Sequence, residues 1–157
     1  MRSFLLILTL TCASQIASSQ QTGALKTAED SVKAVINDMF TGMRTGDKQL
    51  FLSAFSDSVV MQTIRRNKER KTVVVTESLQ EFADFVGTLK KDSADERITF
   101  ETIKIDGPMA IAWTPYSFYH NGKFSHCGVN SFQLIRFEGR WKIQYLIDTR
   151  RIAPCAK

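Results

Sequence analysis

The sequence has few residues of the kinds that bind metals or form covalent intermediates. Its two histidines, His120 and His126, stand in separate contexts, and its three cysteines form no Cys-x-x-Cys pair. Because zinc sites need several such ligands at close spacing, we expect no metal site. A glycine-rich phosphate loop and a nucleophile elbow are also missing from the sequence. These absences predict a protein without a tightly bound cofactor.

Long apolar runs are also missing, although a short one lies near the start of the chain. Arg2 precedes the apolar stretch 4–10, and small and polar residues follow it. This order is typical of a secretory signal peptide, whereas a membrane-spanning helix needs about 20 apolar residues. We therefore predict a signal peptide over residues 1–19, export to the periplasm or the medium, and no stable insertion into a membrane.

Cysteine usage leaves two questions open. Cys12 follows the apolar run and could be the lipidated residue of a bacterial lipoprotein, but the small residue that normally precedes such a cysteine is missing, so we favour cleavage after Ser19. Cys127 and Cys155 would remain, and an oxidising compartment allows them to pair. Either the two form a disulfide, or Cys127 is a buried thiol and Cys155 a thiol at the free end of the chain.

The charge balance is mildly basic. The formal net charge is +5, and one stretch, RRNKERK at residues 65–71, concentrates positive charge. Such a cluster can bind nucleic acid, but an exported protein rarely meets nucleic acid and charge runs normally lie in water. We therefore interpret the stretch as an exposed hairpin loop and predict no nucleic-acid partner.

Helix patterns fill the first half of the chain. Apolar residues recur at spacings of three and four from Val32 to Met43, after a possible N-cap at Thr27 that follows a polar leader. A short helix follows Asp47, and Ser78 with Glu81 forms a capping-box pair before a second amphipathic stripe. Two short strands are expected between these helices, at 59–64 and 73–75.

Strand patterns fill the second half. Alternation begins at Arg97, and the turns Asn121-Gly122 and Glu138-Gly139 separate long strands. A change of parity near Glu101-Thr102 predicts a β-bulge, and Pro115 predicts another bulge or an edge. Helices followed by an antiparallel meander predict one α+β domain over residues 27–152.

The last hairpin, residues 124–151, organises the chain. If Phe137 pairs with Arg140, Asn130 meets Ile147 and one face of the hairpin is apolar. His126 and Asn130 lie at the far end of that face, where they suggest the floor of a pocket. Asp148 faces away on simple alternation, although one bulge in the last strand would reverse its direction.

Three segments carry a resemblance to a known superfamily: AWTPY at 112–116, GKFSHCGVN at 122–130, and the last strand from Trp141 to Arg151. They resemble exported bacterial members, of uncharacterised function, of the nuclear transport factor 2-like superfamily, which includes SnoaL-like cyclases and ketosteroid isomerases. The resemblance implies a cone-shaped α+β fold, with a curved mixed or antiparallel sheet packed on three N-terminal helices. The first helix lacks the tyrosine of the isomerases, which argues against their chemistry.

Candidate site residues follow from the hairpin and the resemblance. His126 could act as a general base with Asp148 orienting it, or could simply be a histidine at the edge of the core. Aromatic and polar side chains could line a ligand pocket or belong to the core; they are Trp113, Tyr116, Tyr119, Asn130, Met39 and Phe40.

The sequence therefore supports three hypotheses. The first is an exported, non-catalytic domain that binds a small apolar or aromatic molecule in a cone-shaped pocket. The alternative is a cofactor-independent lyase, isomerase or cyclase that uses His126 as general base. The third is a homodimer formed through the outer face of the sheet, where alternation places Gln133, Gln144 and Leu146.

Overall fold

The computed structural model describes residues 16–152 and Cys155, with side chains from residue 28 onward. Residues 1–15, including Cys12, lie outside the described part, so the signal peptide and its cleavage site stay predictions. Among the described residues, no helix is both long and apolar enough to cross a membrane.

Three helices precede most of the sheet: α1 (Ile16–Thr45), α2 (Lys48–Ser53) and α3 (Leu79–Val86). The predicted start of the first helix at Thr27 is wrong, and so is the polar leader before it, because α1 already begins at Ile16. Residues 16–26 contain no proline and a single glycine, so no residue there interrupts helical hydrogen bonding.

Two of the predicted helix caps are confirmed. The Asp47 carboxylate accepts a hydrogen bond from the backbone N–H of Leu50 at 2.9 Å, and the Ser78 hydroxyl accepts one from that of Glu81 at 3.3 Å. Each cap satisfies a backbone donor that the first turn of a helix leaves free.

Seven strands form a single mixed sheet in the order β2-β1-β7-β6-β5-β3, with β4 also paired to β5. The pair β1·β7 is parallel and the other pairs are antiparallel. The predicted α+β fold is confirmed. The strands are β1 (Phe55–Arg66), β2 (Thr72–Glu77), β3 (Ala94–Ile98), β4 (Thr102–Asp106), β5 (Met109–His120), β6 (Lys123–Phe137) and β7 (Arg140–Arg151).

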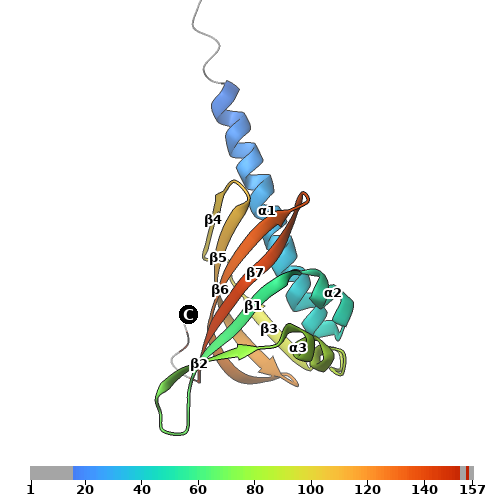
Figure 1. The fold of residues 1–157 in the computed structure, drawn as a ribbon, viewed down its shortest axis with the longest axis vertical. Coiled ribbons are helices and arrows are strands. Elements are labelled where there is room, and N and C mark those ends of the chain that lie inside the picture. Colours follow the sequence, from blue (N-terminus) through green and yellow to red (C-terminus); the bar gives the residue numbers. More distant parts are fainter. Residues whose placement is uncertain (1–15, 153–154, 156–157) are drawn as a thin grey trace, which may run out of the picture.

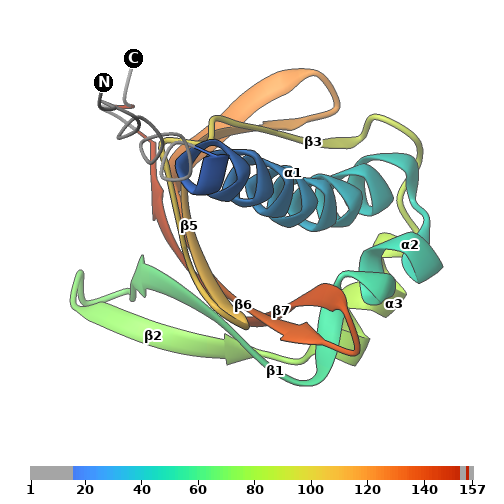
Figure 2. The ribbon, with the colours of Figure 1, turned by 90° about the horizontal axis from the view of Figure 1, so that it is seen from above.

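The sheet curls around α1, as the view from above shows (Figure 2). The stripe predicted on α1, including Val32, Ile36 and Met39, is buried against the concave face of the sheet. Phe132 of β6 is fully buried there and meets Phe40 edge to face, with ring centroids 6.3 Å apart. Half of the buried core residues therefore belong to α1 and to the last hairpin, β6 and β7, whose places in the fold are seen in Figure 1.

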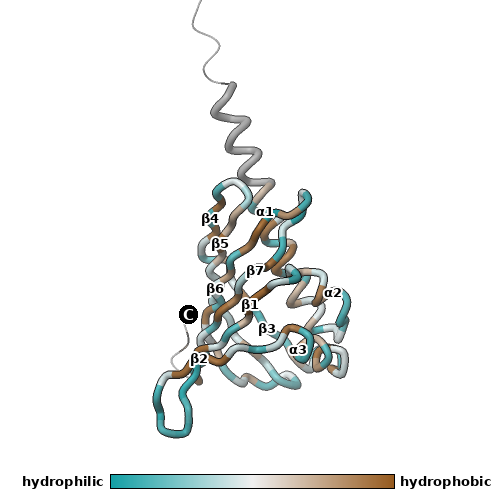
Figure 3. Tube along the Cα trace, in the orientation of Figure 1, coloured by the Kyte–Doolittle hydropathy of each residue, from teal (hydrophilic) through white to brown (hydrophobic). Residues whose placement is uncertain are grey.

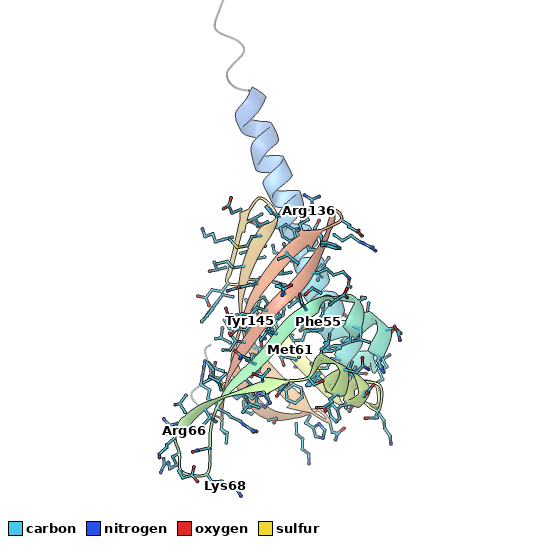
Figure 4. All side chains as sticks on the ribbon, viewed as in Figure 1. Phe55, Met61, Arg66, Lys68, Arg136 and Tyr145 are labelled. Carbon is cyan, nitrogen blue, oxygen red and sulfur yellow. A yellow bond between two sulfur atoms is a disulfide. The ribbon has the colours of Figure 1, made fainter. Side chains whose placement is uncertain are left out.

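The basic stretch forms the predicted loop between β1 and β2. This hairpin projects from one end of the molecule, where Arg66 and Lys68 lie, far from Arg136 at the other end (Figure 4). Its tip is the most hydrophilic part of the trace in that region (Figure 3). The charges of the loop are exposed, as expected for a solvated turn.

The turns predicted between the long strands are confirmed. Asn121 and Gly122 have φ values of 50° and 74°, and Glu138 and Gly139 have 48° and 79°. Two consecutive residues with positive φ are the signature of the two-residue turn that suits a twisted hairpin.

The bulge predicted near Glu101-Thr102 is also confirmed. Ile98 pairs with Tyr116 and Thr102 with Trp113, so the outer strand has one residue more than β5 over this stretch. The extra residue splits the outer strand into β3 and β4, opposite Pro115, whose carbonyl accepts a hydrogen bond from Thr99 at 3.0 Å. The bend lets the sheet curve around α1.

A further bulge, at Gln144 of β7, changes the register of the last hairpin. Leu134 pairs with Ile143 as expected, but Gln133 pairs with Tyr145, so Gln144 has no partner on β6. Its side chain instead bridges an irregular part of β1: it accepts a hydrogen bond from the Ser56 hydroxyl at 2.8 Å and donates one to the Ser58 carbonyl at 3.0 Å.

The shifted register corrects the simple pairing. Asn130 meets Asp148 rather than Ile147, so Asp148 lies on the concave face. Leu146, expected on the outer face, also turns inward for the same reason. Cys127 meets Arg151 and forms a disulfide with Cys155, which answers the question that the sequence left open.

Candidate functional site

A cavity lies between the concave face of the sheet and the three helices. It has a free volume of about 70 Å³ and adjoins an outer cavity of about 230 Å³, with which it shares several lining residues. The shared residues are Met43, Phe82, Glu96, His126 and Arg150.

The walls of the inner cavity are mostly apolar and come from every layer of the fold. Met39, Phe40 and Met43 project from successive turns of α1, which places them on one side of that helix. The other apolar lining residues are Phe51 of α2, Phe82 of α3, Met61 of β1 and Leu146 of β7.

A row of polar residues crosses the sheet at one end of the cavity. Thr114 pairs with Asn130, Asn130 with Asp148, and Asp148 with Thr63. Side chains at paired positions point to the same face of a sheet, so all four share the concave face. The threonines are 0% and 2% exposed for Thr114 and Thr63, and within the described part of the chain their hydroxyls have no hydrogen-bond partner.

Asp148 is held by two neighbours. Its Oδ2 accepts hydrogen bonds from the Tyr116 hydroxyl at 3.1 Å and from Arg150 Nε at 3.0 Å. Tyr116 also donates to the Thr149 carbonyl at 3.0 Å. Burial, with the nearby Asp148 carboxylate, raises the pKa of Tyr116 above its usual range, so the hydroxyl stays a donor.

Gly128 makes room for this arrangement. A Cβ at this position would lie 2.7 Å from Cε1 of the Tyr116 ring and 1.7 Å from the Thr149 carbonyl oxygen. Only glycine therefore lets the tyrosine cross β6 and reach Asp148 on β7.

Glu96 of β3, which was not among the candidate residues from the sequence, completes the polar end. Its Oε1 accepts a hydrogen bond from Asn130 Nδ2 at 2.8 Å. Burial raises the pKa of Glu96 to about 7, and the negative charge of Asp148 adds to this effect, while the Asn130 hydrogen bond and Arg150 oppose it. Its position two residues before the inward-facing Ile98 was the available signal.

His126 lines both cavities without contacting Asp148 through a hydrogen bond. Its ring packs against Phe118 at 5.0 Å and Tyr116 at 5.7 Å, and its Nδ1 lies 3.1 Å from the Ser125 hydroxyl. Burial, and then the positive charge of Arg150, lowers the pKa of His126. Asp148 therefore bonds to Tyr116 and Arg150 instead of orienting the histidine.

The other predicted site residues divide between the two faces of the sheet. Tyr116, Asn130, Met39 and Phe40 line the cavity. Trp113 and Tyr119 are absent from the described lining, which corrects their expected place. Trp113 is 45% exposed, and the Tyr119 ring packs under the Arg97 guanidinium at 4.2 Å and beside Phe124 at 5.9 Å. Alternation along β5 explains both, because Pro115 leaves the strand unbroken and only the even-numbered residues face inward.

Two charged residues at the cavity were not anticipated. Arg150 contacts Asp148 and lies 3.8 Å from Glu77, which ends β2. Arg150 follows Asp148 by two positions, so the same bulge turns both inward. Among the described residues, no group of three or more histidines, cysteines or carboxylates is placed to hold a metal ion.

Comparison with solved structures identifies the fold. A nuclear transport factor 2-like protein of unknown function from Shewanella baltica superposes with a TM-score of 0.62 at 16% identity, over 81% of this chain and 96% of that one. A similar protein, also of unknown function, from Silicibacter pomeroyi has a TM-score of 0.63 at 13% identity, over 81% and 98%. At such identities the likeness shows the fold alone, and the fold that the sequence resemblance implied is confirmed.

Comparison of sequences identifies the family. No curated protein sequence matches the chain. A family model described as "Putative lumazine-binding" matches residues 27–145, which is most of the chain and includes the cavity-lining residues from Met39 to Asn130. The chain therefore belongs to this "putative lumazine-binding" family and has the nuclear transport factor 2-like fold.

Proposed function

We propose that this protein is an exported domain that binds a small, largely apolar or aromatic molecule in the cavity between the sheet and the helices. The observation that carries the proposal is a cavity with apolar walls and a few converging polar groups at one end. Ligand sites commonly have this composition, in which apolar area supplies affinity and a few polar groups fix orientation.

The two adjoining cavities set the size of the ligand. The inner one, of about 70 Å³, has room for about five waters or a small polar group, and the outer one adds about 230 Å³. A ligand would place its head group in the inner cavity and its body against Met43 and Phe82. A flat ring system of the kind named in the family description suits such walls.

A screen of flat heterocycles, lumazine included, tests this proposal by thermal shift. We expect at least one compound to raise the melting temperature, since a ligand that binds only the folded state stabilises it. Leu146→Trp fills the cavity and should abolish the shift, whereas Val60→Trp, on the outer face of β1, should keep it. No stabilisation by any compound, or an equal shift in both variants, would contradict the proposal.

Export is supported by the predicted signal peptide and by the Cys127–Cys155 disulfide, because disulfides persist mainly in oxidising compartments. Mass spectrometry of the protein recovered from its native host checks it. We expect a mature chain that begins at Gln20. A chain that begins at a lipidated Cys12 would instead mean a lipoprotein.

A proton-transfer enzyme is the second candidate, favoured by the raised pKa of Glu96 beside Asp148 and Tyr116. A buried carboxyl that titrates near neutral pH can act as acid or base, and Glu96 fills this role better than His126. Any ligand from the screen can be incubated in D₂O and followed by NMR. Turnover or deuterium uptake that Glu96→Gln abolishes would support the enzyme, and an unchanged ligand would favour simple binding.

The outer face of the sheet supports a homodimer. β5 exposes Met109, Ile111 and Trp113, at 51%, 41% and 45%, on the face opposite the cavity. Apolar side chains gathered on one face commonly mark an interface. Sedimentation should show a dimer that Trp113→Glu dissociates, and a wild type that stays monomeric at high concentration would contradict this part of the proposal.

A further inference from the structure

We propose that the buried end of the ligand is a hydrogen-bond donor, a cationic or N–H-rich group such as an amidinium or an amino-substituted heterocycle, that binds between Glu96 and Asp148. This inference rests on the proposed binding function and names the chemical class that the polar end of the cavity selects.

Donors and acceptors at the polar end of the cavity differ in how fully they are hydrogen-bonded. Of the donors, the Tyr116 hydroxyl binds Asp148 and the Thr149 carbonyl, and Arg150 binds Asp148 through Nε, while its Nη2 lies 3.8 Å from Glu77 as an ion pair. Two acceptor atoms have no partner in the described structure. Within the described chain, Oε2 of Glu96 and Oδ1 of Asp148 have no hydrogen bond. Both residues line the cavity, and neither oxygen is fully enclosed by protein, so a ligand can reach them. Above about pH 7, where Glu96 is ionised, these open acceptors select a ligand that donates.

The lining of the inner cavity has more acidic than basic side chains. Three carboxyl groups, Glu77, Glu96 and Asp148, line the inner cavity, against one arginine, Arg150. A carboxylate or phosphate on the ligand would meet net repulsion in a partly dry site, whereas a cation would relieve the repulsion between Glu96 and Asp148. The lining therefore favours a cation over an anion.

Two buried threonines lie in the sheet beside the polar end of the cavity. Thr63 and Thr114 flank Asn130 and Asp148 in the same row of the sheet, and both hydroxyls are buried without a partner in the described structure. Buried polar groups are normally hydrogen-bonded. Neither threonine lines the cavity, so an ordered water would have to link them to a ligand, and their hydroxyls can donate as well as accept.

The proposal predicts that the affinity for a cation depends on pH, because cation binding is linked to proton release from Glu96. The charged and titratable groups that line the cavity with Glu96 are Tyr116, His126, Asp148, Arg150 and Glu77, and the lining residues from α1 and α3 are apolar. In the free protein Glu96 holds its proton up to a pH of about 7. A bound cation favours the ionised carboxylate, so cation binding should strengthen as the pH rises through this range.

Three probes of nearly identical shape test the proposal on the full chain: benzamidine, benzamide and benzoate. They are a cation with only donors, a neutral amide, and an anion with only acceptors. Affinities measured by NMR titration above about pH 7, where Glu96 is ionised, should follow this order, with benzamidine at least about tenfold tighter than benzamide, as expected for hydrogen bonds to charged groups. Benzoate binding as tightly as benzamidine would overturn the proposal.

Variants locate the binding. Glu96→Gln keeps the shape and removes the charge, so it should weaken benzamidine about tenfold and leave benzamide nearly unchanged. Glu101→Gln is the matched control on an exposed loop residue and should bind all three probes like the wild type. Equal benzamidine affinity in the wild type and in Glu96→Gln would overturn the proposal.

The proposed binding function and the proposed head group can fail separately. If the screen of heterocycles finds ligands but none of the three probes binds, or the ligands found carry only acceptors, the head-group proposal falls and the binding function stands. If the screen also finds nothing, the binding function falls with it.

Discussion

The two ends of the last hairpin lie on the same face of the sheet but differ in burial and polarity. Near the turn, Phe132, Leu134 and Ile143 are fully buried against α1 and form a filled core. Beyond the bulge, Asn130 and Asp148 face a cavity and belong to a polar network. The same pair of strands thus supplies stability at one end and a site at the other.

The bulge at Gln144 separates the two ends. Without it, strict alternation would turn Asp148 and Arg150 to the outer face and leave the concave face without its charges. One extra residue therefore makes the far half of the concave face polar and charged, while the turn and the core stay the same. Predictions that compare substitutions at the two ends test this division.

The largest effect is expected at the filled end. Phe132→Ala removes a fully buried ring that packs on Phe40 and should lower the free energy of unfolding by about 3–5 kcal/mol. Phe137→Ala, at a position 63% exposed beside the turn, should change it little. Urea denaturation checks both, and similar losses in the two variants would contradict the assignment of the core.

Gly128→Ala tests the passage of Tyr116 across β6. Because the added Cβ would meet a backbone oxygen and the tyrosine ring, we expect a loss of about 3 kcal/mol, at the upper end of overpacking effects, and weaker ligand binding. In Gly87→Ala the nearest atom lies at 3.4 Å, so this control should stay close to the wild type. A Gly128→Ala protein as stable as the control would argue against the close packing.

Glu96→Gln tests the polar end through the pH dependence of stability. The pKa of Glu96 is raised from 4.5 to about 7 on folding, so the folded state binds the proton more tightly. The stability that this provides is complete below about pH 4.5 and is lost as the pH rises to about 7, a total of about 1–3 kcal/mol. Glu96→Gln should lack this fall, so its stability relative to the wild type should increase over this pH range. Parallel pH profiles for the two proteins would contradict the raised pKa.

The smallest effect is expected at the bulge itself. Gln144→Ala removes the side-chain bridge to Ser56 and Ser58 and should cost about 1 kcal/mol, with weaker ligand binding because the strand that carries Asp148 is held less firmly. Gln133→Ala, on an exposed position of β6, is the control. Unchanged binding in Gln144→Ala would show that the bulge persists without its side chain.

Most of the fold could be predicted from the sequence, because it depends on local signals. The apolar stripe on α1, the caps at Asp47 and Ser78, and the turns at 121–122 and 138–139 each follow from a few neighbouring residues. The start of α1 was placed too late because a good capping residue does not prevent a helix from continuing past it.

The candidate site could be predicted only in part. His126 and Asn130 lie on the predicted face, but the direction of Asp148 depends on a bulge whose support comes from Ser56 and Ser58, distant in the sequence. Glu96 becomes important only because β3 brings it beside Asn130. Such long-range contacts leave little trace in the spacing of residues along one strand.

The central claim, that the end of the cavity beyond the bulge contains a buried carboxyl that receives a donor group, can be tested most directly by NMR titration of the Glu96 side-chain carboxyl carbon. The account predicts that Glu96 titrates near pH 7 in the free protein and at lower pH when benzamidine is bound. Titration at the ordinary pKa of a glutamate, unchanged by benzamidine, would contradict it.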